Sequence, residues 1–306
     1  MLQRRPARAR WRGASNRPDN PVPARSRVNT PSSNVDSATV ASFGHEWASH
    51  DQSGLPEAEK LQMFDDYFRI FRWSELPPNA EGFDMGCGSG RWASIVAPRV
   101  AKLTCIDPAV AALEVARRNL AGCENVDFLN ANTATTAIPA RSQDFGYSLG
   151  VLHHIPDTES ALADCTRLLK PGAPFLLYLY YRFDNRPPWF RAVWTASELL
   201  RATFKDLPPR AKNAATDVVA ATVYWPMARS AWVAEKLGAN VGSFPLSLYR
   251  DKSFLTMRTD SRDRFGTPLE QRFTRAEISA MMTRCGLTGI VFSESPPYWV
   301  AVGRKA

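Results

Sequence analysis

The feature that most constrains the fold is an alternation of strand-like and helix-like segments between residues 81 and 180. The pattern predicts strands near 81–85, 102–106, 126–129, 144–149 and 174–180, and helices near 91–99, 109–120 and 158–169. Such alternation predicts a parallel sheet with helices on both faces. The segment 174–180 is continuously apolar, which is typical of a strand covered on both sides.

The alternation stops after the fifth strand and resumes near the end of the chain. Residues 182–272 contain several helical patterns and four of the nine tryptophans, and they predict a mostly helical insertion. Thr274 and Glu277 then form a capping box that begins another helix, and strands are predicted near 289–293 and 299–303. We therefore expect a Rossmann-like, doubly wound, seven-stranded, mostly parallel sheet with a helical insertion after the fifth strand.

The N-terminal region differs in composition from the rest. Residues 1–40 carry eight Arg and two Asp and few large apolar residues, and they predict a disordered basic extension. It could be a basic arm for anionic surfaces or a plain unstructured extension. An amphipathic helix is expected near 57–73. We therefore predict five segments: a disordered extension (1–40), an N-terminal helical cap (41–75), a cofactor-binding core (76–181), a helical insertion that serves as a substrate lid (182–272), and a final helix and two strands that complete the core (273–306).

The net charge of +8 is unevenly distributed, because residues 41–181 carry 17 acidic and 11 basic residues. The basic balance therefore does not indicate that the core binds nucleic acid. We see no apolar run long enough to span a membrane and no secretory signal. Five cysteines without a C-x-x-C pair favour reduced thiols and a cytoplasmic location. His45 and His50 are five residues apart, so no metal site is predicted.

A glycine-rich loop carries the strongest functional signal. Gly86, Gly88 and Gly90 follow the first strand and open a helix, where backbone N–H groups can approach a ligand closely. Asp107 ends the next strand, and a carboxylate there can accept hydrogen bonds from ribose hydroxyls. The dinucleotide fingerprint G-x-G-x-x-G fails because its third glycine position is Arg91.

Four segments together resemble one family. Residues 83–92 (Phe-Asp-Met-Gly-Cys-Gly-Ser-Gly-Arg-Trp) resemble the first motif of class I S-adenosylmethionine-dependent methyltransferases, and 105–108 (Cys-Ile-Asp-Pro) resemble their second strand. Residues 144–155 resemble the fourth strand of these enzymes and the loop that follows it. Residues 168–172 (Leu-Leu-Lys-Pro-Gly) resemble the turn before their fifth strand. The likeness covers roughly 80–181 and 274–306 and is nearest to the methyltransferase type 11 group.

The resemblance implies S-adenosyl-L-methionine as cofactor and a role for each matching residue. Gly86, Cys87, Gly88 and Gly90 would line its methionine part, and Asp84 would orient the loop and meet the ammonium group. Asp107, with Pro108 beside it, would hold the ribose. Asn132, through its amide oxygen, and Thr133 would face the adenine edge. Leu149 and Gly150 would present backbone groups near the reacting centre.

Residues for the acceptor are less sharply defined. His154, in the loop after the fourth strand, is the candidate general base because histidine titrates in a useful range, although it could instead only brace that loop. Asp157 is expected to cap the next helix. Phe43, His45 and Trp47 could cover the cofactor or pack an N-terminal helix. Substrate contacts in the insertion are predicted for Tyr224, Trp225, Tyr249 and Arg250.

The expected function is methyl transfer to a small-molecule acceptor, such as a natural product, lipid or sugar intermediate, by in-line displacement (EC 2.1.1.-). Nucleic-acid methylation and a non-catalytic binding protein on the same fold are the alternatives. Ser295-Pro296-Pro297-Tyr298 resembles a motif of DNA methyltransferases, but it lies between the last two strands and is interpreted as a turn. No nucleic-acid partner is expected, and oligomeric state is not predicted.

Overall fold

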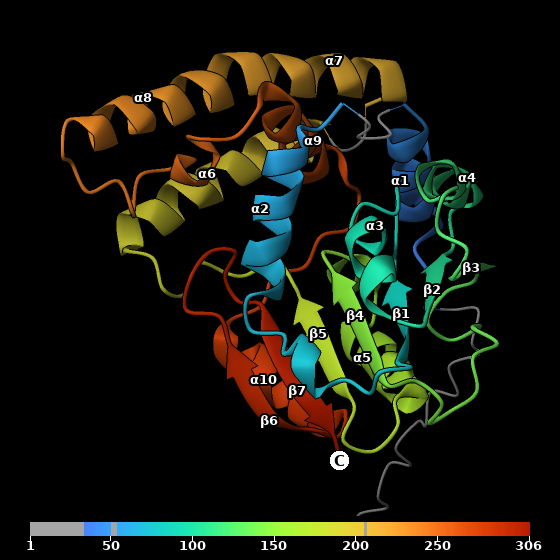
Figure 1. Ribbon diagram of the computed structural model, residues 1–306. Coiled ribbons are helices and arrows are strands. Elements are labelled where there is room, and N and C mark those ends of the chain that lie inside the picture. The colour runs from blue at the N-terminus through green and yellow to red at the C-terminus, as the bar shows by residue number, and fades with distance from the viewer. Residues whose placement is uncertain (1–33, 50–53, 205–206) are drawn as a thin grey trace, which may run out of the picture.

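The computed structural model describes residues 34–49, 54–204 and 207–306, and its centre is a seven-stranded sheet (Figure 1). The strand order is β3-β2-β1-β4-β5-β7-β6. The strands are β1 (Glu81–Met85), β2 (Lys102–Asp107), β3 (Val126–Asn130), β4 (Phe145–Leu149), β5 (Pro174–Tyr178), β6 (Leu287–Phe292) and β7 (Ala301–Lys305). Strands β1–β5 pair in parallel and β7 is antiparallel to both neighbours. The predicted fold class is confirmed.

Helices cover both faces of this sheet, as the alternation predicts. On one face α2 (Glu57–Phe68), α3 (Ala93–Val96) and α4 (Val110–Asn119) share an apolar core with β2, β4 and β5. On the other, α5 (Thr158–Leu168) and α10 (Arg275–Arg284) pack on the sheet. Both predicted helix starts are confirmed: Asp157 accepts a hydrogen bond from the Ser160 N–H, and Thr274 forms its capping box with Glu277.

The N-terminal helix α1 (Ser37–Ser49) begins earlier than the composition suggested. Asp36 Oδ1 accepts a hydrogen bond from the Thr39 N–H at 2.7 Å, which caps the helix inside the segment assigned to the disordered extension. Residues 1–33 of that predicted extension lie outside the described residues. Helix α1 packs on α4, and α2 ends at Phe68, several residues before the expected end.

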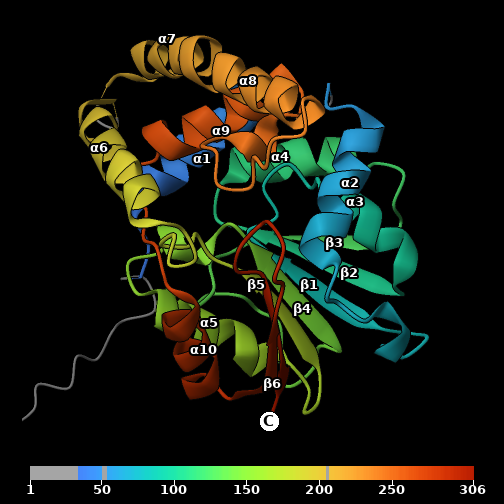
Figure 2. The same ribbon diagram turned by 90° about the vertical axis from the view of Figure 1, so that its left-hand side faces the viewer.

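The chain between β5 and α10 forms α6 (Pro188–Phe204), α7 (Pro209–Val219), α8 (Trp225–Lys236) and α9 (Phe254–Gly266). A π-helical turn, Ala220–Tyr224, joins α7 to α8 in one long rod. These helices lie over the carboxyl ends of the parallel strands, with α7 and α8 outermost (Figures 1 and 2). Ligands bind at that edge in open α/β sheets, so the insertion covers the side where a site is expected. Within the described part of the chain no helix has the length and apolarity needed to cross a membrane.

Candidate active site

The loop after β1 depends on its glycines. Gly86, Gly88 and Gly90 have positive φ angles of 81°, 54° and 75°, which other residues rarely adopt. A Cβ on Gly86 would lie 2.4 Å from Val151 Cγ1, and one on Gly90 would lie 2.8 Å from a side chain just after α4. Those two glycines are required by packing, whereas a Cβ on Gly88 would meet the Trp47 ring at 3.1 Å.

Asp107 ends β2 and holds this loop. Its Oδ2 accepts a hydrogen bond from the Gly88 N–H at 3.0 Å, and its Oδ1 accepts one from the Ala109 N–H at 2.9 Å. Burial raises the pKa of Asp107 to about 6, although both hydrogen bonds act in the opposite direction. Each carboxylate oxygen has a further lone pair, so Asp107 can also accept hydrogen bonds from the hydroxyls of a ligand.

A cavity of about 140 Å³, which we call the loop cavity, lies beside this loop and Asp107. It brings together most of the residues that the sequence singles out. Its lining includes Gly86, Cys87, Gly88, Asp107, Pro108, Asn132, Thr133, Leu149 and Gly150, together with Phe43, Trp47 and His154. These residues come from the ends of β1, β2 and β4, the segment after β3, and helix α1.

Two of the predicted cofactor residues, Asp84 and Gly90, are not in that lining. Asp84 is 2% exposed, and its Oδ2 has no hydrogen-bond partner among the described residues. Burial raises the pKa of Asp84 to about 8, an effect that the neighbouring Tyr147 hydroxyl opposes. A buried carboxyl oxygen without a partner is costly, so Asp84 is suited to receive a cation or a bridging water.

The adenine-edge candidates are engaged within the protein. Asn132 Oδ1 accepts hydrogen bonds from the N–H groups of Ala134 and Thr135, both at 2.9 Å. The amide oxygen expected to face a ligand is therefore used to build the turn after β3, and the side-chain NH₂ remains as the polar group for a ligand. Thr133 Oγ1 donates to Asp164 Oδ2 at 3.2 Å.

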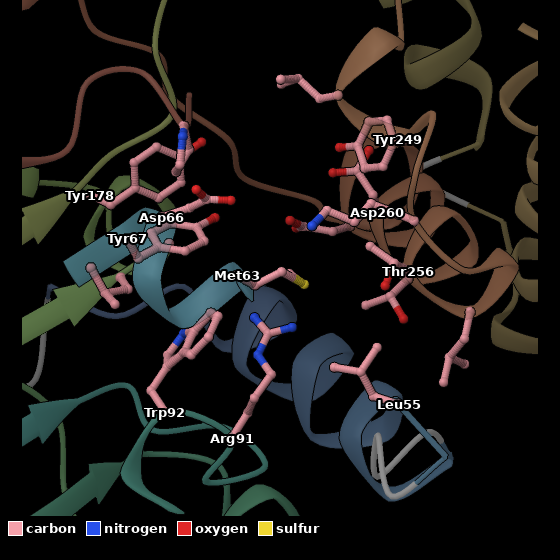
Figure 3. Close-up of a pocket in the computed structure, with 18 of the residues that line it drawn as sticks. Leu55, Met63, Asp66, Tyr67, Arg91, Trp92, Tyr178, Tyr249, Thr256 and Asp260 are labelled. Carbon is pink, nitrogen blue, oxygen red and sulfur yellow. The ribbon is translucent and has the colours of Figure 1, made fainter. Parts of the chain in front are cut away.

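A second cavity, of about 270 Å³, adjoins the loop cavity. We call it the acidic cavity because Glu46, Asp66, Asp260 and Asp263 line it. Figure 3 shows Asp66 and Tyr67 on one side, facing Asp260 and Tyr249 across it. The two cavities have six residues in common: Phe43, Trp47, Arg91, Trp92, Leu149 and Gly150. Two ligands bound in them would meet at this shared wall.

Two carboxyl groups of the acidic cavity, those of Glu46 and Asp263, are protonated more readily than usual. Burial, and next the charge of Asp263, raises the pKa of Glu46 to about 8. Burial, and next the charge of Glu270, raises the pKa of Asp263 to about 7. Carboxyl groups whose pKa values lie near neutrality can exchange protons at physiological pH.

His154 lines the loop cavity but not the acidic cavity, and its ring faces Asp263, which lines the acidic cavity. Its Nδ1 is 2.6 Å from the Leu269 carbonyl oxygen; because a carbonyl only accepts, Nδ1 carries the proton. Its Nε2 is buried without a hydrogen-bond partner among the described residues and lies 3.7 Å from Asp263 Oδ1. Burial lowers the pKa of His154 to about 4, which is below the range near neutrality that favoured this residue in the sequence. Nε2 therefore carries a free lone pair at neutral pH, but it is a weaker base than an ordinary histidine.

The substrate residues predicted in the insertion separate into two groups. Tyr249 lines the acidic cavity, and Tyr224 donates to Asp260 Oδ2 at 2.9 Å. Trp225 is 47% exposed and Arg250 pairs with Glu235 at 2.7 Å. Neither Trp225 nor Arg250 lines the loop cavity or the acidic cavity.

Several residues that line the loop cavity or the acidic cavity were not predicted from the sequence. Glu46 shares α1 with Phe43 and Trp47, and its spacing of three from Phe43 is the signal that could have found it. Arg91 was used only to exclude a dinucleotide, yet it lines both cavities. Pro296 and Pro297 do lie in a turn between β6 and β7, but that turn reaches the acidic cavity, and nothing in the sequence indicates this.

Comparison with known proteins gives consistent results. A family model described as a methyltransferase domain matches residues 83–177. A ubiquinone biosynthesis O-methyltransferase of Stutzerimonas stutzeri is 30% identical over 166 residues, which are 51% of this chain and 66% of the relative. The protein of the same name from Pseudomonas paraeruginosa is 32% identical over 178 residues, 55% and 73% of the two chains. The chain spans about two thirds of the length of these relatives.

Solved structures are similar at a lower level. The YcgJ protein from Bacillus subtilis has a TM-score of 0.45 and 17% identity, with 77% of this chain and 70% of that chain covered. The S-adenosylmethionine-dependent methyltransferase SibL has a TM-score of 0.48 and 14% identity, with 83% and 60% covered. At these scores neither structure bears on function.

Proposed function

The chain belongs to the class I S-adenosylmethionine-dependent methyltransferases, and from that premise we propose that it methylates a small-molecule acceptor held in the acidic cavity. The observation that carries this proposal is the wall that the loop and acidic cavities share, which includes Leu149 and Gly150. Methyl transfer requires alignment of an acceptor atom with the methyl group, and alignment alone can supply several kcal/mol. The insertion, residues 182–272, would close the acceptor side.

The loop cavity suits S-adenosylmethionine, the cofactor of this family, on three grounds. Asp107 has lone pairs left for the ribose hydroxyls, the Gly88 backbone leaves room that a Cβ would fill, and buried Asp84 lacks a partner on Oδ2. When bound, the cofactor supplies a methyl group activated by a cationic sulfur. Among the protein groups, the Asp107 carboxylate binds and orients it, the loop glycines let the backbone approach it closely, and Asp84, which does not line the cavity, acts on its ammonium group through a bridging water.

We assign the role of general base to His154. Its Nε2 has the free lone pair to take a proton from an acceptor hydroxyl, and the Leu269 carbonyl fixes the ring through Nδ1. The Asp263 carboxylate, 3.7 Å away, would stabilise the imidazolium that forms. The relatives' names as O-methyltransferases support a hydroxyl acceptor. We propose a cytoplasmic location from the five cysteines, all of which are free thiols.

Cofactor affinity is expected to increase with pH between 6 and 7.5. Without ligand, Asp84 has a pKa of about 8 and is mostly protonated in that range, whereas a bound cation favours its carboxylate. Binding therefore releases a proton, and affinity increases by up to about tenfold per pH unit. Calorimetry with S-adenosylmethionine at several pH values measures this. Asp84→Asn should bind with less pH dependence than the wild type, and equal profiles for the two proteins would contradict the role of Asp84.

The acceptor class is tested with methyl-labelled S-adenosylmethionine. Purified protein is incubated with the labelled cofactor and separate small-molecule and nucleic-acid fractions of the source cells. Label is expected in a small molecule. Label in nucleic acid would overturn the acceptor assignment, and cofactor binding without transfer to any fraction would favour a non-catalytic binding protein.

A further inference from the structure

A third cavity, of about 280 Å³, adjoins the acidic cavity and is lined largely by residues of the insertion. We call it the aromatic chamber. It has five lining residues in common with the acidic cavity: Tyr178, Tyr180, Leu248, Tyr249 and Asp260. The chamber therefore borders the acidic cavity along these residues, and a ligand that spans both cavities would pass them.

The wall of the chamber is dominated by rings. Ten of its lining side chains are aromatic: Tyr178, Tyr180, Tyr181, Phe183, Phe190, Trp194, Tyr224, Phe244, Tyr249 and Phe265. They come from the end of β5 and the segment after it, from α6 and α9, and from the turns around α8. Such walls make large apolar contacts and offer few hydrogen bonds to a polar ligand.

The four charged side chains in this wall, Arg186, Asp260, Arg264 and Arg272, all have partners within the protein. Arg186 has no carboxylate partner among the described residues, but it donates to the Tyr181 hydroxyl at 3.3 Å and to the Gly242 carbonyl. Arg264 is bonded to Glu270 at 3.4 Å and its guanidinium lies 4.8 Å from the centre of the Trp194 ring. Arg272 is bonded to Glu270 at 2.7 Å. Asp260 accepts its hydrogen bond from Tyr224. Paired charges that stack on rings need no ionic ligand, so the wall does not select for a charged or heavily hydroxylated group.

The outer end of the chamber reaches the surface. Val193, Val223 and Phe244 line the chamber and are exposed large hydrophobic side chains. An apolar chain longer than the chamber could therefore extend through this opening. Because the side chains around this opening are exposed, they can be enlarged without disturbing a buried core.

We propose that the aromatic chamber binds an apolar arm of the acceptor, a hydrocarbon chain or ring system, while the methylated group stays in the acidic cavity. The proposal rests on the proposed function, because the arm belongs to the molecule that receives the methyl group. It names a substrate class: a lipophilic molecule with one polar, reactive end. A small, wholly polar metabolite such as a sugar would leave the chamber wall without a partner.

The test uses 4-n-alkylphenols, from ethyl to heptyl, as probes of the chamber. Their affinities are measured by calorimetry on the full chain saturated with S-adenosylhomocysteine. Burial of each added methylene should raise affinity by about fourfold, until the chamber is filled. An affinity that is independent of chain length, or no binding of any member, would overturn the proposal.

A pair of variants locates the effect. Val223→Trp enlarges a side chain that lines the chamber, whereas Val218→Trp makes the same exchange at an exposed site on α7 outside it. Val223→Trp should weaken heptylphenol binding at least tenfold and leave ethylphenol within twofold, and Val218→Trp should change neither. Equal effects of the two variants would contradict the location. Cofactor binding is measured in parallel and separates the two proposals. A wild-type protein that binds no cofactor would contradict the proposed function, whereas the dependence of alkylphenol affinity on chain length tests the chamber alone.

Discussion

Replacement of His154 by Gln is expected to lower the rate of methyl transfer by about 100- to 10,000-fold, the usual contribution of a general base. In the wild type the Leu269 carbonyl oxygen lies 2.6 Å from His154 Nδ1. The side-chain NH₂ of Gln can still donate to this carbonyl. What the variant loses is the free lone pair of Nε2 beside Asp263. Turnover of the acceptor found by methyl labelling measures the effect, and the affinity for the cofactor should change by less than threefold.

His153 provides the matched control for this experiment. It is fully buried, adjoins His154 in the same turn, and packs on Tyr180 with ring centres 4.0 Å apart. His153→Phe keeps an aromatic ring of similar shape and should retain activity within about tenfold, since it removes no proton acceptor from the reacting groups. If His154→Gln retains more than a tenth of wild-type activity, His154 only braces the loop.

Replacement of Asp107 by Ala is expected to weaken binding of S-adenosylmethionine by about 1–3 kcal/mol, or roughly 5- to 150-fold. The change removes the acceptor of the Gly88 and Ala109 N–H groups and the proposed partner of the ribose hydroxyls. Calorimetry measures the affinity directly. Asp107→Asn keeps the side-chain volume and one carbonyl oxygen, so it should lie between the wild type and the alanine variant.

Asp127→Ala is the control for Asp107→Ala. Asp127 lies on the neighbouring strand β3, where it is exposed and pairs with Lys102 at 2.8 Å. Its replacement should alter neither stability nor cofactor affinity measurably, because surface ion pairs contribute little. An unchanged affinity in Asp107→Ala, with the fold intact by thermal unfolding, would contradict the assignment of Asp107 to the ribose.

The parts of the fold that local sequence determines were predictable. Strand β1 has the predicted bounds, 81–85, and α5 and α10 begin at their predicted caps. The glycine loop and Asp107 were found because the chain order in an alternating α/β fold brings successive strand ends to one edge.

The rest depends on tertiary contacts that no local pattern encodes. The spacing G-x-G-x-G does not distinguish Gly88, whose backbone faces a cavity, from Gly90, which packs against the end of α4. The amide oxygen of Asn132 was assigned to a ligand, but the backbone of its own turn uses it. Pro296 and Pro297 reach the acidic cavity because β7 returns antiparallel beside β5.

The proposed function depends on binding of the adenosyl sulfonium of S-adenosylmethionine in the loop cavity. A crystal structure of the protein grown with S-adenosylhomocysteine tests it most directly. We expect both ribose hydroxyls to bind the Asp107 carboxylate and the sulfur to lie at Leu149 and Gly150, in the wall shared with the acidic cavity. A loop cavity that stays empty under saturating ligand, or one that instead binds NAD, would contradict it.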